Sequence, residues 1–211
     1  MYAVLTIDVK QSTELSPEQM HQANKEIKTI IQEIPNHTTE SIIAIGFTAG
    51  DEFEIILENL NDLNKVIYFL RANLSVEFRL GVGTGTVENK NPDKDPSQMW
   101  GTAFQKAREA LDKAKERDMQ VHIETGEDEL DAHLNTIIEL ICFIRASLTQ
   151  TQRRILDQYN YQSTFLGLET QRELADRLNI SDAMVSKTLK KTGYEFLRNG
   201  ERLVQRLLLE T

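Results

Sequence analysis

Two acidic side chains, Asp8 and Asp51, have the chemistry and the sequence positions expected of a cation site. Asp8 lies at the end of the apolar segment YAVLTIDV (2–9), and Asp51 follows a glycine in the short turn between IIAIGF and FEIIL. Segments joined by so short a turn pair antiparallel, and a first strand beside that hairpin would bring both carboxylates to one edge of a sheet. Carboxylate oxygens are the ligands that Mg²⁺ prefers, often together with phosphate oxygens. The pattern therefore predicts that Asp8 and Asp51 bind one or two Mg²⁺ ions.

Each of these acids also has an ordinary explanation when it is considered alone. Asp51 has the type and place of a solvated residue at the tip of a turn, where acids are common. Asp8 has the place of a strand-end residue that accepts hydrogen bonds from the next loop. The hypothesis of a metal site therefore depends on the two carboxylates meeting at one edge of the sheet.

The loop after Asp8 has features that suit phosphate binding. It leads to a helix that begins near Pro17, where Ser16 and Gln19 form a predicted capping box. Free N–H groups and the positive end of the helix dipole attract anions at such a position, and a lysine adds a point charge. We therefore expect nucleotide phosphates to contact the loop residues Val9, Lys10, Gln11, Ser12 and Thr13.

A second group of residues, in the last third of the chain, has the pattern of a DNA-binding unit. Thr149 begins one helix, Thr170 and Glu173 form a capping box at the start of another, and Ser181 caps a third. The last two helices are short and are joined by the turn Leu178-Asn179-Ile180, as in a helix-turn-helix unit. The phrase LADRLNIS followed by VSKTL resembles bacterial repressor and sigma-factor-type domains. The residues predicted to face inward are Leu174, Ala175, Leu178, Met184, Val185 and Leu189.

The second helix of such a unit enters the major groove of DNA with its N-terminal residues. Ser186 and Lys187 are predicted to reach base edges, whereas Lys190 and Lys191 suit phosphates. The predicted outward face of this helix consists of Ser181, Asp182, Ala183, Ser186, Lys187, Lys190 and Lys191, and the residues that could extend its basic surface are Arg153, Arg154 and Arg172. The alternative for this three-helix segment is a protein-docking module.

The uneven distribution of charge along the chain indicates two domains with different functions. The chain has 211 residues, of which 40% are hydrophobic and 27% charged, and its formal net charge is −9. Residues 149–211 carry 10 basic and 8 acidic side chains, so that the tail is mildly basic and the remainder is acidic. No apolar run approaches the roughly 18–20 residues that cross a bilayer, and the start of the chain lacks a signal-peptide pattern. Together with the single cysteine, Cys142, this predicts a cytoplasmic protein with no membrane partner.

The order of elements predicts the fold class. We expect strands over 2–9, 42–47, 53–57, 76–87 and 119–123, and helices over 17–34, 61–72 and 97–116. This βαββαβαβ order is the ferredoxin-like α+β pattern, an antiparallel sheet with helices on one face. Glycines in segment 76–87 predict a close approach of another backbone or of a ligand to that strand.

A long helix is predicted over 126–148, and its apolar residues lie on more than one side. Such a helix packs against two bodies. We therefore divide the chain into a ferredoxin-fold domain (1–125), a linking helix (126–148) and a helix-turn-helix domain (149–211).

The first of these domains is described as cyclase-like because of a resemblance in four segments. The segments TIDVKQST, AGDEFEIIL, RLGVGTGTV and WGTAFQKAREAL resemble, in order and spacing, the catalytic core of class III nucleotide cyclases and GGDEF diguanylate cyclases over roughly residues 2–123. The resemblance implies that Asp8 and Asp51 hold two metal ions that bind a nucleoside triphosphate, with help from Glu52 and the Val9 carbonyl. Over the whole chain the pattern is similar to the SatD family, bacterial proteins with a cyclase-like N-terminal region and a helix-turn-helix C-terminus.

The chain departs from class III cyclases on the helix that begins near Gly101. Those enzymes carry an asparagine and, four residues later, an arginine, and the matching residues here are Gln105 and Glu109. Arg108 stands one residue before the arginine position, which is about 100° around a helix. These differences concern cyclisation more than nucleotide binding, for which Gln105 and Arg108 stay candidates.

The sequence thus favours a homodimeric, DNA-binding transcriptional regulator with a nucleotide- and Mg²⁺-binding, cyclase-like sensor domain. The alternative is an active nucleotide cyclase or nucleotidyl transferase whose helix-turn-helix tail is regulatory. A third possibility is a scaffold that uses neither site.

Overall fold

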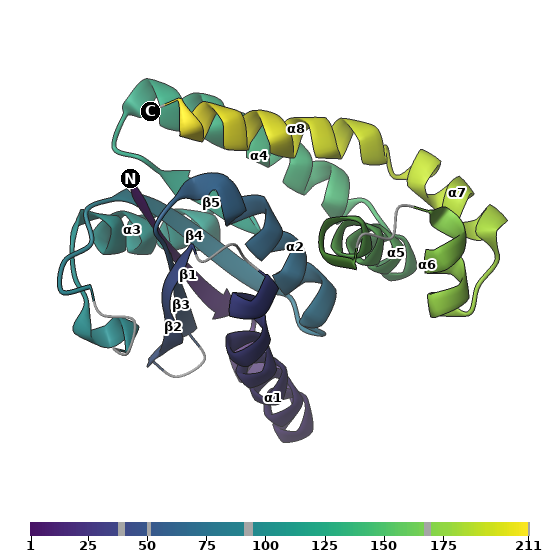
Figure 1. Ribbon diagram of the computed structural model, residues 1–211, viewed down its shortest axis with the longest axis horizontal. Coiled ribbons are helices and arrows are strands. Elements are labelled where there is room, and N and C mark those ends of the chain that lie inside the picture. The colour runs from purple at the N-terminus through teal and green to yellow at the C-terminus, as the bar shows by residue number, and fades with distance from the viewer. Residues whose placement is uncertain (38–40, 50–51, 91–94, 167–169, 211) are drawn as a thin grey trace.

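The computed structural model describes residues 1–37, 41–49, 52–90, 95–166 and 170–210 (Figure 1). This part of the chain contains the strands β1 (Tyr2–Val9), β2 (Ile42–Ala49), β3 (Glu52–Leu57), β4 (Phe78–Gly85) and β5 (Val121–Glu124). Its α-helices are α1 (Pro17–Glu33), α2 (Leu63–Asn73), α3 (Thr102–Glu116), α4 (Asp128–Ala146), α5 (Gln150–Tyr161), α6 (Gln171–Leu178), α7 (Asp182–Lys191) and α8 (Tyr194–Leu209). The protein is therefore of the mixed α+β class, with the βαββαβαβ order that the sequence predicts up to β5.

The five strands form one sheet in the order β2-β3-β1-β4-β5. β1 pairs antiparallel with β3 and with β4, β2 pairs antiparallel with β3, and β5 pairs parallel with β4. The first four strands thus have the antiparallel order of a ferredoxin-like sheet, and the crossover through α3 adds β5 at one edge. β1 lies in the centre, where its apolar side chains are buried on both faces.

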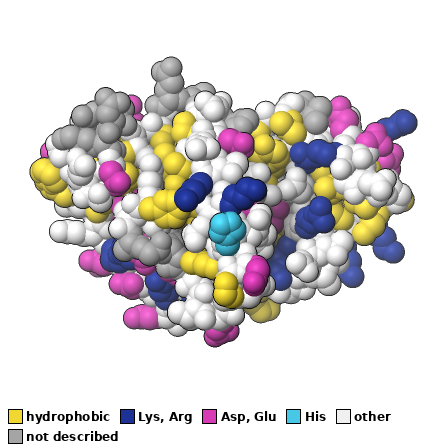
Figure 2. Space-filling model, turned by 90° about the horizontal axis from the view of Figure 1, so that it is seen from below, with side chains coloured by type: hydrophobic (Ala, Val, Ile, Leu, Met, Phe, Trp, Pro, Cys, Tyr) yellow, Lys and Arg dark blue, Asp and Glu magenta, His cyan; other side chains and the backbone are white. Residues whose placement is uncertain are grey.

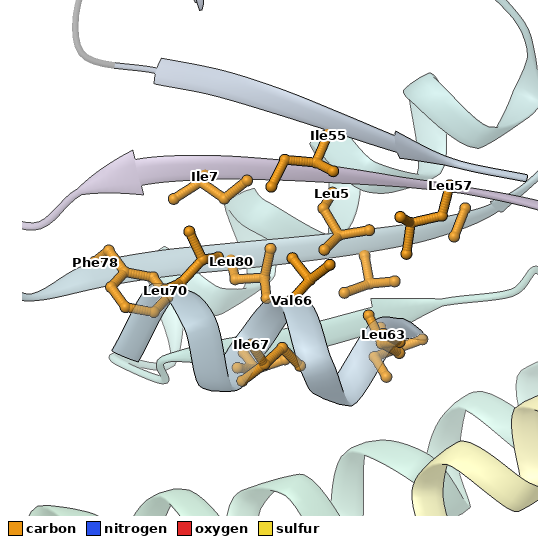
Figure 3. Packing of buried hydrophobic residues seen from close by; sticks show 14 of the residues in the cluster. Leu5, Ile7, Ile55, Leu57, Leu63, Val66, Ile67, Leu70, Phe78 and Leu80 are labelled. Atoms are coloured by element: carbon orange, nitrogen blue, oxygen red, sulfur yellow. The ribbon is translucent and has the colours of Figure 1, made fainter. Parts of the chain in front are cut away.

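Helices cover both faces of this sheet, so the prediction of helices on one face is wrong. On one face, Leu5 and Ile7 pack in the main core with residues of α1 and α2, and Figure 3 shows Val66 and Leu70 of α2 in this layer. On the other face, Val4 packs in a separate cluster with Ala103 and Ala107 of α3.

Glycines of β4 allow α3 to lie on that second face. A Cβ atom on Gly81 or Gly83 would lie less than 3.0 Å from backbone atoms of α3, including the carbonyl oxygens of Ala107 and Ala103 respectively. Real Cβ atoms do not approach so closely, because packed interiors leave no such overlap. The close approach predicted for segment 76–87 is therefore made by the backbone of α3.

The C-terminal helix returns to the sheet instead of staying within the tail. Val204 and Leu208 of α8 belong to the same buried cluster as Leu134 and Ile138 of α4 and the core side of the sheet, and α8 runs beside α4 in Figure 1. The first turn of α8 contributes Leu197 to a second cluster with α5, α6 and α7. α8 thus connects the core of the sheet with the core of the tail, and the domain boundaries stay a prediction.

Buried charges also join the tail to the sheet. The Arg71 guanidinium of α2 contacts the Glu201 carboxylate of α8 at 2.7 Å, and the Tyr68 hydroxyl donates to the same carboxylate at 2.8 Å. Arg145 of α4 contacts Asp157 of α5 at 2.7 Å. All five side chains are largely buried. None of the helices in the described part of the chain is long and apolar enough to cross a membrane.

Candidate functional site

The end of β1 and the start of β3 meet at one edge of the sheet. The pairing of Ile7 with Phe53 places Asp8 beside Glu52 on the next pair of positions. Both carboxylates point toward α3, where the Lys115 ammonium lies 3.3 Å from Asp8 Oδ1 and 3.4 Å from Glu52 Oε1. Their side chains are 13% and 14% exposed. The turn residue Asp51 lies outside the described residues, so its approach to Asp8 stays a prediction.

A further carboxylate, Glu54, lies on the same face of the sheet. It is largely buried and accepts a hydrogen bond of 3.2 Å from the Thr6 hydroxyl of β1. Burial raises the pKa of Glu54 above its ordinary value, and the negative charge of Glu52 raises it further. The Thr6 hydrogen bond and the positive charge of Arg108 act in the opposite direction. We did not predict Glu54 as a site residue, although its alternation with Glu52 along one strand face was visible in the sequence.

Helix α3 supplies the positive charges of this group. Arg108 Nη1 contacts Glu52 Oε2 at 2.6 Å, so this arginine does reach the acids near the hairpin. Partial burial alone would lower the pKa of Arg108, but the Glu52 carboxylate outweighs that cost and raises it. Lys115 was missed by the sequence analysis. It lies two helical turns after Arg108, which is the spacing that places both side chains on one stripe of α3.

The donor set fits a cation in type but is already neutralised by protein groups. One ammonium contacts both Asp8 and Glu52, so the two carboxylates are close enough together to share a single positive charge. Within the described ranges, no group of three or more His, Cys, Asp or Glu side chains is placed to hold a metal ion. A divalent ion at this edge would therefore have to replace Lys115 between the two acids.

The loop after β1, where we expect phosphate to bind, is held by contacts with the β4 side of the sheet. Lys10 contacts Asp118 at 2.7 Å and its backbone N–H donates to Glu77, on the β4 side of the sheet edge. Gln11 has a positive φ of 54°, and the chain then forms a single 3₁₀ turn, Ser12–Glu14, which includes Thr13. Helix α1 begins only after Ser16, whose hydroxyl already accepts from the Gln19 N–H. The assignment of residues 9–13 to phosphate binding stays a prediction, but Lys10 is engaged by Asp118.

The other two positions taken from the resemblance are exposed. Gln105 and Glu109 both lie on the solvent side of α3. Among the three α3 residues discussed above, Arg108 is therefore the one that contacts the acids at the sheet edge.

Substitution of Glu54 tests whether burial of its charged carboxylate destabilises the fold. A carboxyl whose pKa is raised by burial holds its proton more tightly in the folded protein than in the unfolded chain. The free energy of unfolding therefore rises as the pH falls through the folded-state pKa, and it falls as the pH rises through that pKa. We expect Glu54→Gln to raise the urea midpoint at pH 8, and this gain to shrink as the pH falls toward 5. The exposed Glu58→Gln serves as the control and should show no such pH-dependent gain. A midpoint for Glu54→Gln that is below wild type at pH 8 would show that the charged form is not under strain.

In the tail, helices α6 and α7 form a tight pair. The Thr170 and Glu173 side chains form the predicted capping box of α6, and the Ser181 hydroxyl accepts from the Met184 N–H at the start of α7. The turn between them contains Asn179 with φ 54°, a left-handed conformation that asparagine tolerates. The predicted inward residues Leu174, Ala175, Val185 and Leu189 are buried.

Met184 is an exception among the predicted inward residues. The residue is 40% exposed and lies in the first turn of α7, where it lines a shallow pocket with Ile155 and Leu178. Leu178 is only partly buried but packs against the cluster as expected.

The predicted outward face of α7 lies in solvent. Its exposed residues are Ser181, Asp182, Ala183, Ser186, Lys187, Lys190 and Lys191. Of the three arginines expected to extend this surface, Arg172 and Arg154 are exposed, whereas Arg153 pairs with Glu77 at 2.9 Å. Figure 2 shows Lys and Arg side chains spread over the end of the molecule that α5–α7 form.

Comparisons with known proteins give a family and a distant structural neighbour. The family model described as "SatD family" matches residues 2–207. A comparison with curated proteins finds no match. Among solved structures, the chain is similar to the GGDEF domain of PA1120 (YfiN or TpbB) from Pseudomonas aeruginosa, with 21% identity, a TM-score of 0.41, and coverage of 60% of this chain and 82% of that one.

Proposed function

The chain belongs to the SatD family, and we propose that it is a DNA-binding regulator that reads duplex DNA with α7. The observation that carries the proposal is the division of α7 into two faces. Val185 and Leu189 are buried against the neighbouring helices, whereas Lys187, Lys190 and Lys191 are exposed with no acidic partner in the described part of the chain. α6 and α7 then act as a helix-turn-helix unit.

The roles within α7 follow from its direction. The recognition helix of such a unit places its N-terminal residues against base edges, so Ser186 and Lys187 contact bases. Lys190 and Lys191 lie in the last turn and contact phosphates, which adds affinity without sequence preference. Asp182, at the first position of α7, disfavours phosphate near the helix start and restricts how the helix enters the groove.

The phosphate contacts give a direct test by salt dependence. We expect Lys190→Gln/Lys191→Gln to lower the slope of log affinity against log salt by about 2, since each lost phosphate contact removes about 0.9 from it. The measurement is fluorescence anisotropy with a labelled duplex at several salt concentrations. The matched control is Lys25→Gln/Lys28→Gln, which removes two exposed lysines from α1. Equal slopes for both double variants and wild type would contradict the assignment of α7.

A dimer would supply the phosphate contacts that one α7 lacks. Two-fold related recognition helices bind half-sites about one helical turn of DNA apart. On the outer side of α4, Leu140 and Phe143 are 61% and 76% exposed, and Phe196 of the neighbouring α8 is also exposed. This surface agrees with a helix expected to pack against two bodies, and we place the homodimer contact there.

A second candidate function concerns the acids at the sheet edge. Because one ammonium contacts both Asp8 and Glu52, we propose that these carboxylates, together with Asp51, hold Mg²⁺ when a nucleoside triphosphate binds. The ion would supply positive charge between the carboxylates and the phosphates. Arg108 and Lys115 would then be freed to contact phosphate oxygens.

Competition between Lys115 and a divalent ion can be measured without a nucleotide. We expect Lys115→Gln to bind Mn²⁺ at least tenfold more tightly than wild type. Two unit positive charges about 4 Å apart repel by about 1 kcal/mol in bulk water and about 4 kcal/mol near a protein surface, and a divalent ion is repelled about twice as strongly. Electron paramagnetic resonance of free Mn²⁺ gives the affinity. Lys113→Gln, on the same helix but paired with Glu124, is the control. Unchanged Mn²⁺ binding in Lys115→Gln and in Asp8→Asn would remove the sheet edge as a cation site.

The alternative of an active enzyme is tested on the same acids. Incubation with labelled ATP or GTP and Mn²⁺ would give a product that is lost in Asp8→Ala and in Asp51→Ala if the chain turns nucleotides over. If no product forms and DNA affinity changes with nucleotide, the domain is a sensor. If DNA affinity is unchanged across the titration, the coupling between the two parts is wrong.

A further inference from the structure

A cleft runs between the sheet and the tail, on the side of the β1 loop that faces α5. It consists of two adjoining cavities of about 710 and 130 Å³. The walls come from the connection between α2 and β4, the start of β5, the end of α4 and the first turns of α5. Glu77, Arg145 and Arg153 line both cavities, so the two are continuous.

Positive side chains outnumber acidic ones among the residues that line this cleft. The positive side chains are Lys10, Arg71, Arg79, Arg145, Arg153 and Arg154. Arg153 and Arg154 lie in the first turns of α5, whose N-terminus adds the positive end of a helix dipole. The acids that face the cleft are Glu26, Glu77, Asp118 and Asp157. Glu26 already accepts two hydrogen bonds from Ser75, and the other three pair with Lys10, Arg79, Arg145 and Arg153.

Arg145 is the central group of the cleft. Its side chain is 8% exposed, yet it makes a single side-chain hydrogen bond, from Nη2 to Asp157 Oδ1. A guanidinium has five N–H donors, and the hydrogen bond to Asp157 uses one of them. Burial, and after it the nearby Arg71 guanidinium, lower the pKa of Arg145 despite Asp157 and Glu201. A further negative charge beside Arg145 would offset both effects.

Arg79 adds a second incomplete group at the narrow end of the cleft. Its Nε is buried and has no hydrogen-bond partner in the part of the chain that the structure describes. Its Nη2 shares the single carboxylate of Asp118 with Lys10. Lys10 also lies 4.0 Å from Glu77, which pairs with Arg153, so three cations share two carboxylates and leave one positive charge in excess.

We propose that this cleft binds a small phosphate-bearing molecule, whose phosphate groups lie against Arg145 with Arg79 and Arg153 at its sides. Guanidinium groups bind phosphate oxygens in pairs, and this pairing favours arginine over lysine at such sites. The backbone of a DNA duplex does not fit this cleft. Arg145 is nearly buried, and a phosphate that is linked into a DNA strand cannot enter deeply enough to contact it. Among the described residues, none of α7 lines the cleft, and neither do Asp8, Glu52 or Glu54, although Arg79 pairs with Asp8 across β1 and β4 and Lys10 follows β1. The cleft therefore neighbours the acids at the sheet edge and extends the proposed function with an effector site.

The position of the cleft gives the ligand a structural role. Arg153 of α5 contacts Glu77 before β4, and the Gln158 amide donates to the Ala72 carbonyl at 2.8 Å. These contacts cross the mouth of the cleft from the tail to the sheet domain. An anion that binds arginines from both sides would hold α5, and with it the α6–α7 pair, in one position relative to the sheet.

Calorimetric titration of the full chain with pyrophosphate tests the site. We expect wild type to bind and Arg153→Gln to bind at least tenfold more weakly. Arg172→Gln removes an exposed arginine of α6 outside the cleft and should bind as wild type does. The paired variant Arg145→Gln/Asp157→Asn removes the central charge without leaving a buried acid unpaired, and it should abolish binding while its unfolding stays cooperative.

Several outcomes would overturn the proposal. One is no binding of pyrophosphate by wild type at millimolar concentration, and another is equal affinity in wild type, Arg153→Gln and Arg79→Gln. Pyrophosphate binding that is lost in Lys190→Gln/Lys191→Gln would assign the anion to α7 instead. Retained pyrophosphate binding in a protein that fails to bind DNA would leave the cleft in place and reject the DNA-binding function alone.

Discussion

Gly83→Ala should destabilise the fold by about 3 kcal/mol or more, at the upper end of the cost of overpacking a core. The added methyl group would lie less than 3.0 Å from the backbone nitrogen of Ala107 and the carbonyl oxygen of Ala103. Both atoms belong to the helix backbone of α3, so no side chain can rotate away to make room. Either α3 moves off β4 as a unit or the strand shifts. Urea unfolding followed by far-UV circular dichroism measures the loss.

Gly200→Ala is the matched control for this change. A Cβ at Gly200 of α8 would meet the Cδ1 atom of Ile141 at 3.2 Å, which is the flexible end of a side chain. Alanine is also favoured over glycine in a helix by up to about 1 kcal/mol, so this variant should be as stable as wild type or slightly more stable. A loss of less than about 1 kcal/mol for Gly83→Ala, within the usual range of single mutations, would mean that α3 does not rest on β4 as described.

Glu201→Gln should cost about 3 kcal/mol, because removing one partner of a buried ion pair leaves the other charge uncompensated. The Arg71 guanidinium would stay buried between α2 and α8 with only the weaker attraction of Asp157, and the Tyr68 hydroxyl would lose a charged acceptor. Burial, followed by the Glu201 charge, raises the pKa of Tyr68 well above its ordinary value. Thermal and urea unfolding of the variant measure the loss.

Two further variants separate the charge effect from a general effect on α8. Glu195→Gln removes an exposed acid from the first turn of the same helix and should cost less than about 1 kcal/mol. Arg71→Met/Glu201→Gln removes both charges and should recover much of the lost stability, as replacement of whole buried pairs often does. If the double variant is no more stable than Glu201→Gln, the cost comes from lost packing and not from the unpaired charge.

Local signals in the sequence located the elements well. Ser16, Thr149, Thr170 and Ser181 are all helix caps as predicted, because a cap is decided by residues within three positions of it. The strand segments were also found, since period and β-branched content identify a buried strand without knowledge of its partners. Strand order alone also predicted that the end of β1 and the hairpin before β3 lie at one edge of the sheet, whereas the predicted approach of Asp51 to Asp8 lies outside the described residues.

Contacts between distant segments were out of reach of such signals. Arg71 and Glu201 are separated by 130 positions, and nothing local marks either as a member of a buried pair. Three other features also join residues that are far apart in the chain. They are the packing of α8 on the sheet, the second helical layer formed by α3, and the contact of Lys115 with two acids. Each depends on how helices pack in three dimensions, and a single sequence gives their faces but not their partners.

α8 gives a physical account of how the two halves of the chain can influence each other. Its first turn packs with Leu189 of α7 in the core of the tail, while Val204 and Leu208 lie in the core of the sheet. A shift of α8 relative to the sheet would therefore move α7. The ion pair between Glu201 and Arg71 fixes the position of α8 on the sheet. In this account, a ligand that binds at the sheet edge or in the cleft between sheet and tail would shift α8 and, through it, the proposed DNA-binding face of α7.

The central claim, that α7 reads duplex DNA, is tested most directly by selection of bound duplexes from a random pool with the wild-type chain. The account predicts enrichment of a motif with two related half-sites whose centres lie about 10–10.5 base pairs, or a multiple of that spacing, apart. The same selection with Lys190→Gln/Lys191→Gln should retain far less DNA at equal salt. A pool that shows no enrichment, and equal retention by wild type and this variant, would contradict the claim.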